Sequence, residues 1–187
     1  METPGRRERK KAATRQALAD AALKLFLERG YDQVSIRDIA EAADVSTTTL
    51  FKHFPGKEAL VFDESQDREE RLVAAVRERK KGQSIVEALR EYVLATWLPL
   101  TKHPQYAEFT ALVTGTPALQ EYGERMWTRH AATLGAAIAE DTGADSDDIA
   151  CHALARFVLD IPALTRGRPD PREDVERIFD LLERGWR

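Results

Sequence analysis

The sequence predicts an all-α fold of about nine helices, with an N-terminal three-helix unit ahead of a larger helical bundle. In most segments apolar residues recur every three or four positions, the spacing that gathers them on one face of a helix. The alternating β-branched stretches that predict strands are missing. Glycine and proline interrupt the pattern where helices are expected to end.

Two short helices are expected one after the other near the end of the first third of the chain. Ser35 and Asp38 have the spacing of a capping box, although Asp replaces the usual Glu or Gln. Ser46 is placed to cap the second short helix. Asp44 lies in the turn between them, where a positive φ is often needed and Asp is tolerated better than most residues.

The other periodic segments predict longer helices with recognisable ends. Gly30 follows the first of them and Gly82 another, because glycine accepts the left-handed conformation common after a helix terminus. Ser84 and the acidic run 145–148 are suited to the N-termini of two more, where exposed N–H groups favour oxygen and negative charge. Pro162 is expected to kink or end its helix. These helices are expected over residues 7–29, 57–81, 84–99, 104–113, 118–140, 149–166 and 171–185.

The net charge of −4 is divided unevenly along the chain. Residues 1–57 carry 11 Lys/Arg against 8 Asp/Glu, and the remainder carries 17 against 24. A basic N-terminal third on an acidic body is typical of a DNA-facing domain attached to a body that faces elsewhere. The alternative is an ordinary solvated tail. The densest basic cluster is Arg6, Arg7, Arg9, Lys10, Lys11 and Arg15.

The composition argues against several classes of protein. No apolar run approaches the roughly 18 residues of a membrane span, and the charged N-terminus lacks the apolar core of a secretory signal. A single cysteine, Cys151, argues against a disulfide framework and a thiolate zinc cluster. We therefore expect a soluble cytoplasmic protein without a metal or other cofactor.

An enzyme and a helical protein-interaction adaptor are the rival classes. The four histidines are scattered, and His152 beside Cys151 would point about 100° away from it on a helix. No glycine-rich phosphate loop, Gly-x-Ser-x-Gly or His-Glu-x-x-His motif is present. We therefore expect no catalysis. An adaptor would not explain an exposed threonine-rich helix flanked by cations.

The second short helix is the segment that indicates a function. With its apolar residues packed inward, it would expose Thr47, Thr48, Phe51 and Lys52. Threonine can hydrogen-bond a base edge and touch a thymine methyl, and Lys52 can pair with phosphate or guanine. Two short helices joined by a tight turn, with the second one projecting, predict a helix-turn-helix that docks in the major groove. An ordinary αα-hairpin is the alternative.

The same segment resembles the DNA-binding head of TetR-type regulators. The similarity runs over residues 10–62 and agrees in order and spacing at more than a dozen positions. It includes Gly30-Tyr31, Ser35-Ile-Arg-Asp-Ile-Ala, Val45-Ser46, Thr49-Leu-Phe-Lys-His-Phe54 and Lys57-Glu-Ala-Leu60. Phe51 stands where tyrosine is commoner and Asp44 where glycine is usual, which puts the strength of individual contacts in doubt.

The resemblance implies roles for the residues of this head. It places residues 1–56 in a DNA-binding domain that contacts phosphates through both short helices and base edges through the two threonines. The start of the helix that opens at Lys57 adds a further phosphate site. With Lys52 from the exposed face of the second short helix, the predicted DNA contacts are Ser35, Arg37, Thr47, Thr48, Phe51, Lys52, His53 and Lys57.

Residues 57–187 would then form a domain that binds an effector and dimerises. The implied function is a homodimeric regulator that is released from a palindromic operator by a small, largely apolar molecule; repression is the family default, and activation stays open. The candidate effector contacts, which are otherwise core residues, are Trp97, Tyr106, Phe109, Met126, Trp127 and His130. The candidate dimer contacts are Leu154, Phe157, Val158, Ile161, Val175, Ile178, Phe179 and Leu182, with Trp186 continuing the last stripe. Arg156 and Asp160, four positions apart, are expected to pair at the edge of this interface.

Overall fold

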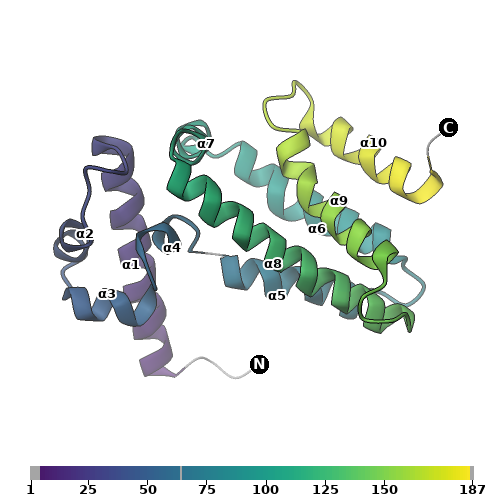
Figure 1. Ribbon diagram of the computed structural model, residues 1–187, viewed down its shortest axis with the longest axis horizontal. Helices are drawn as coiled ribbons and strands as arrows, with labels where there is room; N and C mark the ends of the chain where they lie inside the picture. The colour runs from purple at the N-terminus through teal and green to yellow at the C-terminus, as the bar shows by residue number, and fades with distance from the viewer. Residues whose placement is uncertain (1–4, 64, 186–187) are drawn as a thin grey trace. The chain divides into compact units, whose positions relative to one another are not determined.

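A computed structural model describes residues 5–63 and 65–185, and in these ranges the chain forms ten α-helices and no strand. The all-α prediction is confirmed. The chain divides into two compact units (Figure 1). The first unit comprises Met1–Asp63 and Ala107–Gly123, and the second comprises Glu64–Tyr106 and Glu124–Arg187.

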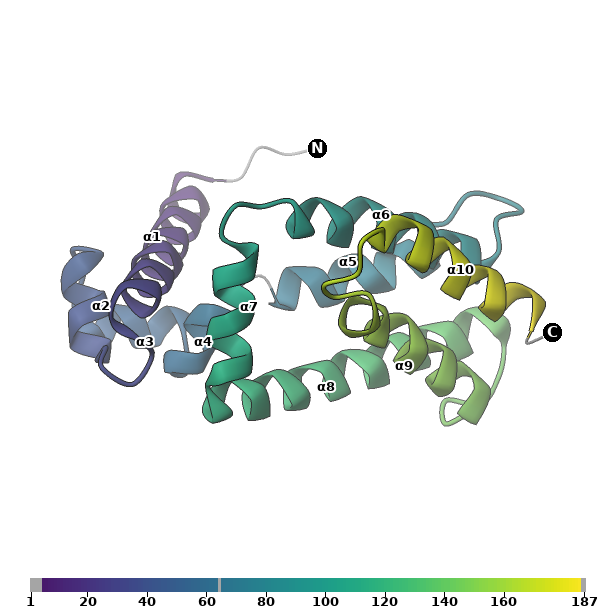
Figure 2. The ribbon, with the colours of Figure 1, turned by 90° about the horizontal axis from the view of Figure 1, so that it is seen from above.

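The first unit is built around α1, Arg6–Arg29, which ends at Gly30 as predicted. It also contains α2 (Ile36–Ala42), α3 (Thr47–His53), α4 (Lys57–Val61), most of α7 (Tyr106–Gly115) and the start of α8 (Pro117–Thr142). Figure 1 shows α2 and α3 beside α1, and Figure 2 shows α7 alongside α4. Their shared core includes Leu18, Phe26, Ile39, Leu50, Phe54, Leu60 and Leu119, all nearly or fully inaccessible to solvent.

The caps predicted for the two short helices are confirmed. The Ser35 hydroxyl accepts a hydrogen bond from the Asp38 backbone N–H at 3.2 Å, and the Asp38 carboxylate accepts one from the Ser35 N–H at 2.8 Å. The Ser46 hydroxyl accepts from the Thr49 N–H at 3.1 Å. Asp44 adopts a φ of 53°, so it takes the left-handed conformation expected of the turn.

The single helix predicted over residues 57–81 is wrong, because the chain breaks it into α4 and α5, Ser65–Arg77. Phe62 leaves the helical conformation, with φ −110° and ψ 39°, and stacks on Tyr122 with 5.6 Å between ring centroids. Arg15 holds Asp63 through an Nε–Oδ1 contact of 2.6 Å. These distant contacts override the local preference for helix. The break gives ten helices in the described residues, where about nine were expected.

The second unit packs α5 with α6 (Ile85–Thr101), most of α8, α9 (Ile149–Leu164) and α10 (Pro171–Arg184). Ser84 and Asp148 cap α6 and α9 as predicted. Pro162 lies inside the last turn of α9, and the helix continues to Leu164. Figure 2 shows α10 alongside α6, where Arg90 pairs with carboxylates of α10. The core includes Leu72, Val76, Leu89, Leu134, Ile138, Val158, Ile161, Val175 and Phe179.

No helix in the described ranges is both long enough and apolar enough to span a membrane.

Helices α8 and α9 approach each other closely at Gly135. A methyl group there would lie 2.9 Å from Cγ and Cε1 of the His152 ring. The ring cannot swing away freely, because its Nε2 is 2.9 Å from the Ser146 carbonyl oxygen. Glycine at this position therefore allows the two helices to pack.

We predict that Gly135→Ala lowers the free energy of unfolding by about 1–3 kcal/mol, the usual cost of forcing extra volume into a packed site. Chemical denaturation measures it. Gly115→Ala is the matched control, because a methyl group at that position meets no atom within 4 Å. Adding His152→Ala to Gly135→Ala should recover part of the loss. A Gly135→Ala protein as stable as wild type would contradict this account of the helix contact.

Candidate nucleic-acid interface and pocket

Helix α3 presents one face to solvent and one to the core. Thr47, Thr48, Phe51 and Lys52 are exposed, while Leu50 is completely buried. Phe51 is 56% exposed, which is unusual for a large apolar side chain and leaves it without a role in the core of its own unit. The four exposed side chains lie on one side of the helix, as predicted.

The N-terminus of α2 adds two more of the predicted residues to the surface. Ser35 and Arg37 are both exposed. The Ser35 hydroxyl and backbone N–H lower the pKa of the Asp38 carboxyl, so this carboxylate stays ionised within the cap. Arg37 and Lys52 supply exposed positive charge on α2 and α3.

The side chains of His53 and Lys57 are less exposed to solvent than those of the other predicted contacts. Burial, and then the charge of Arg15, lower the pKa of His53, which keeps the imidazole neutral near pH 7. The Lys57 amine donates a hydrogen bond to the Tyr31 carbonyl and lies 3.9 Å from the centroid of the Tyr31 ring. Burial also lowers the pKa of Lys57. To reach a phosphate, this amine would have to leave Tyr31.

Arg15 of α1 links that helix to the end of α3 and to the segment after α4, a role that sequence reasoning missed. Its guanidinium donates to the carbonyls of His53 at 2.9 Å and Asp63 at 3.1 Å. It also lies 4.4 Å from the centroid of the Phe54 ring. Arg15 thus ties α1 to the end of α3. Its partners are 38 and 48 residues away, so no local pattern separates it from the neighbouring basic residues.

The first turns of α1 extend the basic surface. Residues 5–13 are all exposed and include most of the basic cluster. The charged groups of these residues are exposed to solvent, whereas the Arg15 guanidinium packs on the Phe54 ring.

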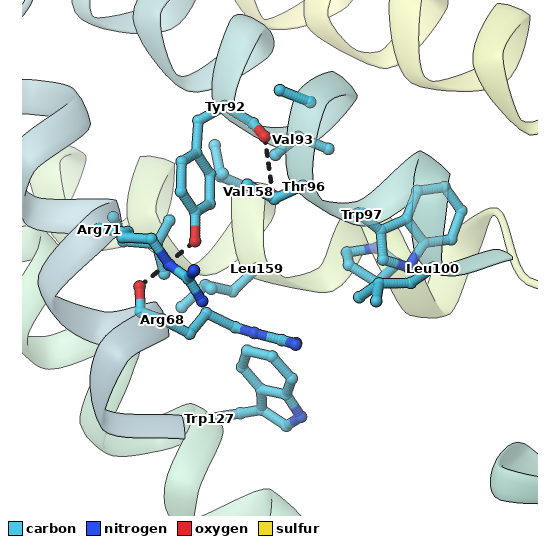
Figure 3. Close-up of a pocket in the computed structure, with 13 residues that line it drawn as sticks. Arg68, Arg71, Tyr92, Val93, Thr96, Trp97, Leu100, Trp127, Val158 and Leu159 are labelled. Carbon is cyan, nitrogen blue, oxygen red and sulfur yellow. Dashed lines mark hydrogen bonds between the residues drawn. The ribbon is translucent and has the colours of Figure 1, made fainter. Parts of the chain in front are cut away.

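The second unit contains a pocket of about 260 Å³ (Figure 3). Trp97 and Trp127, two of the predicted effector contacts, line it. Its other lining residues are Arg68, Arg71, Leu72, Tyr92, Val93, Ala95, Thr96, Leu100, Val158, Leu159 and Pro162. Sequence reasoning missed the arginines and Tyr92, because polar residues in a helical pattern are ordinarily assigned to the solvent face.

The other four predicted effector contacts lie elsewhere. Phe109 packs against the core of the first unit, and Tyr106 is half-buried at the start of α7. Met126 and His130 are buried, with 4% and 0% exposure. His130 lies edge-on to Trp127, with 5.5 Å between ring centroids, so it supports a lining residue without lining the pocket itself.

The predicted dimer residues separate into buried and accessible groups. Phe157 is 57% exposed, whereas Leu154, Ile178 and Leu182 are partly buried. Ile149 and Leu164, also on α9, are 81% and 64% exposed and were not predicted. The predicted Arg156–Asp160 pair is present at 3.2 Å, and Trp186 lies outside the described residues. Four predicted residues are at most 1% exposed and belong to the core of the second unit: Val158, Ile161, Val175 and Phe179.

Comparison with known proteins agrees with this geometry. The family model described as "Bacterial regulatory proteins, tetR family" matches residues 18–63, which include α2, α3 and α4. The HTH-type transcriptional regulator TcmR of Streptomyces glaucescens is 37% identical over 86 residues, covering 46% of this chain and 38% of TcmR. The HTH-type transcriptional repressor AcnR of Corynebacterium diphtheriae is 26% identical over 192 residues, covering 92% of this chain and 91% of AcnR.

A solved structure resembles the fold over most of its length. NalD, the secondary repressor of the MexAB-OprM multidrug efflux pump in Pseudomonas aeruginosa, has a TM-score of 0.62 at 22% identity. The match covers 94% of this chain and all of that one. Over residues 18–63 the chain contains the DNA-binding domain of the TetR family, a family of transcriptional regulators and not of enzymes. The resemblance predicted from the sequence is confirmed.

We predict that Arg15→Met lowers the free energy of unfolding by about 1–3 kcal/mol, because it removes the ion pair with Asp63 and the hydrogen bonds to the carbonyls of His53 and Asp63. Chemical denaturation measures the change. Arg9→Met removes an exposed arginine of the same helix and should have little effect. Equal stability of the two variants would refute the role assigned to Arg15.

A second prediction concerns the buried His130. Burial lowers its pKa below the usual 6.5, while Glu69 opposes the shift. Its imidazolium is therefore disfavoured in the folded state, so stability is retained above pH 6.5 and lost as the pH falls through the folded-state pKa. Between pH 7.5 and 5, His130→Gln should lose less stability than wild type. His103→Gln, at an exposed site, should follow the wild-type curve; parallel curves for all three proteins would exclude this linkage.

Proposed function

We propose that this chain is a sequence-specific DNA-binding regulator that represses transcription in the cytoplasm. The observation that carries the proposal is the exposed face of α3, with Thr47 and Thr48 beside Lys52 on a helix supported from behind by α1. The family match over residues 18–63 supports the same segment. The description of AcnR as a repressor favours repression over activation.

The residues of the first unit divide into two roles. Thr47 and Thr48 read base edges, and Phe51 contacts a thymine methyl or the backbone beside it. Ser35, Arg37, Lys52, His53 and Lys57 orient the unit on phosphates, which provide affinity without sequence information. This division follows from position along α3: the threonines are at its N-terminal end, which is the end that approaches the bases in helix-turn-helix proteins.

The regulator works as a homodimer on a palindromic operator. One reading helix contacts one half-site, and specific affinity generally needs two half-sites related by a dyad. The accessible apolar side chains of α9 and α10 supply the contact. Phe157 is the most exposed of the predicted residues, and the partly buried Leu154, Ile178 and Leu182 complete the contact. The buried residues of the predicted set belong to the core behind them.

An effector pocket completes the proposal. A small, largely apolar molecule occupies the cavity beside Trp97 and Trp127, and its binding releases the operator. Pockets between bundle helices, lined by aromatics with a few polar groups, are common ligand sites. Four of the predicted effector contacts do not line this cavity, so their role stays a prediction: Tyr106, Phe109, Met126 and His130.

Fluorescence anisotropy with labelled DNA flanking the protein's own gene tests DNA binding. Affinity should fall steeply as salt rises, because phosphate contacts release counterions. Arg37→Ala should weaken binding to all duplexes alike and reduce the slope of log K against log salt by about 1. Thr48→Ala should cost about 1–3 kcal/mol on the preferred operator and little on unrelated DNA.

Identical behaviour of the Arg37→Ala and Thr48→Ala proteins would contradict the division of roles. Salt-insensitive binding of the wild type, or none, would contradict the proposed function itself.

A pair of exposed aromatics tests the dimer independently of DNA. Phe157→Glu places a charge on the proposed interface and should give a monomer by light scattering. Phe51→Glu is the matched control: it changes a similarly exposed phenylalanine in the first unit, so the protein should stay dimeric and lose its affinity for DNA. A dimeric Phe157→Glu protein would move the interface away from this face.

A further inference from the structure

The pocket of the second unit carries positive charge on one wall. Arg68 and Arg71 are three positions apart on α5, so they lie on the same side of that helix and both line the cavity. The Arg68 guanidinium lies 5.8 Å from the centroid of the Trp127 ring. Figure 3 shows Arg68 reaching over Trp127. The thirteen described residues that line the cavity include no Asp or Glu.

The two hydroxyl groups of the pocket, those of Tyr92 and Thr96, are neutral and already donate hydrogen bonds. The Tyr92 hydroxyl donates a hydrogen bond to the Arg68 backbone carbonyl at 3.3 Å, and the Thr96 hydroxyl donates to the Tyr92 carbonyl at 2.8 Å. Burial raises the pKa of Tyr92, so the phenol stays protonated at neutral pH. The two guanidinium groups therefore set the charge of the cavity wall.

Two acids, Glu69 and Glu70, lie between the arginines in sequence, and neither lines the cavity. The Glu69 carboxylate contacts Arg129 at 3.5 Å and the His130 imidazole at 3.3 Å, both on α8, and it does not line the cavity. The lining also has an apolar part that includes Trp97, Leu159 and Pro162. The cavity can therefore contact both an anionic group and an apolar group of the same small ligand.

We propose that this pocket selects a small amphiphilic carboxylate, an aryl or medium-chain alkyl acid, over neutral molecules of the same shape. The carboxylate pairs with Arg68 and Arg71, whose planar guanidinium groups suit two-point contact with carboxylate oxygens. The hydrocarbon lies against Trp97 and Trp127. A volume near 260 Å³ is below that of pockets for drug-sized ligands, so the acid is small. A regulatory effect of this acid rests on the proposed function, but the binding of the acid to the pocket does not.

Isothermal titration calorimetry of the full-length protein without DNA tests this selection. The probes are cinnamate against cinnamamide and octanoate against octanamide, matched pairs that differ in charge and little in shape. At least one acid should bind about tenfold or more tighter than its amide, the expected effect of a charge-assisted hydrogen bond. Equal affinities within both pairs, or no binding of either acid, would overturn the proposal.

Variants locate the charge effect. The double change Arg68→Gln and Arg71→Gln should abolish the preference for the acid and leave amide binding nearly unchanged. Arg77→Gln on the same helix is the control, because Arg77 contacts Glu140 and does not line the cavity. If Arg77→Gln removes the preference equally, the effect is general electrostatics and the proposed site is wrong. Thermal unfolding confirms that each variant is folded, and the wild-type comparison of acid with amide needs no variant.

Measuring acid binding by calorimetry and DNA binding by anisotropy on the same protein distinguishes the two proposals. Acid binding without any DNA binding would overturn the proposed function and leave the pocket assignment standing. DNA binding without acid preference would do the reverse.

Discussion

Helices α2 and α3 are seven residues long, and the candidate reading surface depends on their attachment to α1. Helices of this length are marginal in water, because nucleation costs more than a few hydrogen bonds return. Two caps satisfy their first N–H groups, and Ile39 and Leu50 bury them against α1. Arg15 then fixes the carbonyl at the end of α3. The exposed residues of α3 are held in position by this buried side and not by the helix itself.

Exposure separates apolar residues that lie close together in the sequence. Phe54 is buried in the core of the first unit, whereas Phe51, three positions earlier, is open to solvent. Val158 is buried in the second unit while its neighbour Phe157 is exposed. The exposed member of each pair has no packing role inside the chain, which is why we assign Phe51 to DNA and Phe157 to a second copy.

Local features could be predicted from the sequence, and distant ones could not. The caps at Ser35 and Ser46 and the positive φ of Asp44 depend on a few neighbouring residues, and all three predictions are confirmed. The break after α4 depends on Arg15, whose contact with Asp63 spans 48 residues, so helical periodicity alone predicted one long helix.

The pocket was predictable in part for the same reason. Apolar spacing identifies aromatics such as Trp97 and Trp127 as inward-facing, but a polar residue at a helical position is assigned to solvent unless the packing of other helices is known. Arg68 and Arg71 face a cavity because α6, α8 and α9 supply its other walls. Periodicity likewise predicted two apolar faces on α9 and α10 without showing which of their residues the chain itself buries.

The central claim, that α3 reads DNA in a symmetric dimer, is tested most directly by hydroxyl-radical footprinting on the DNA flanking the protein's own gene. The account predicts two protected half-sites related by a dyad, with centres about one helical turn or a multiple apart, and their loss on Phe51→Glu. A single unsymmetrical footprint, or protection that survives Phe51→Glu, would contradict it.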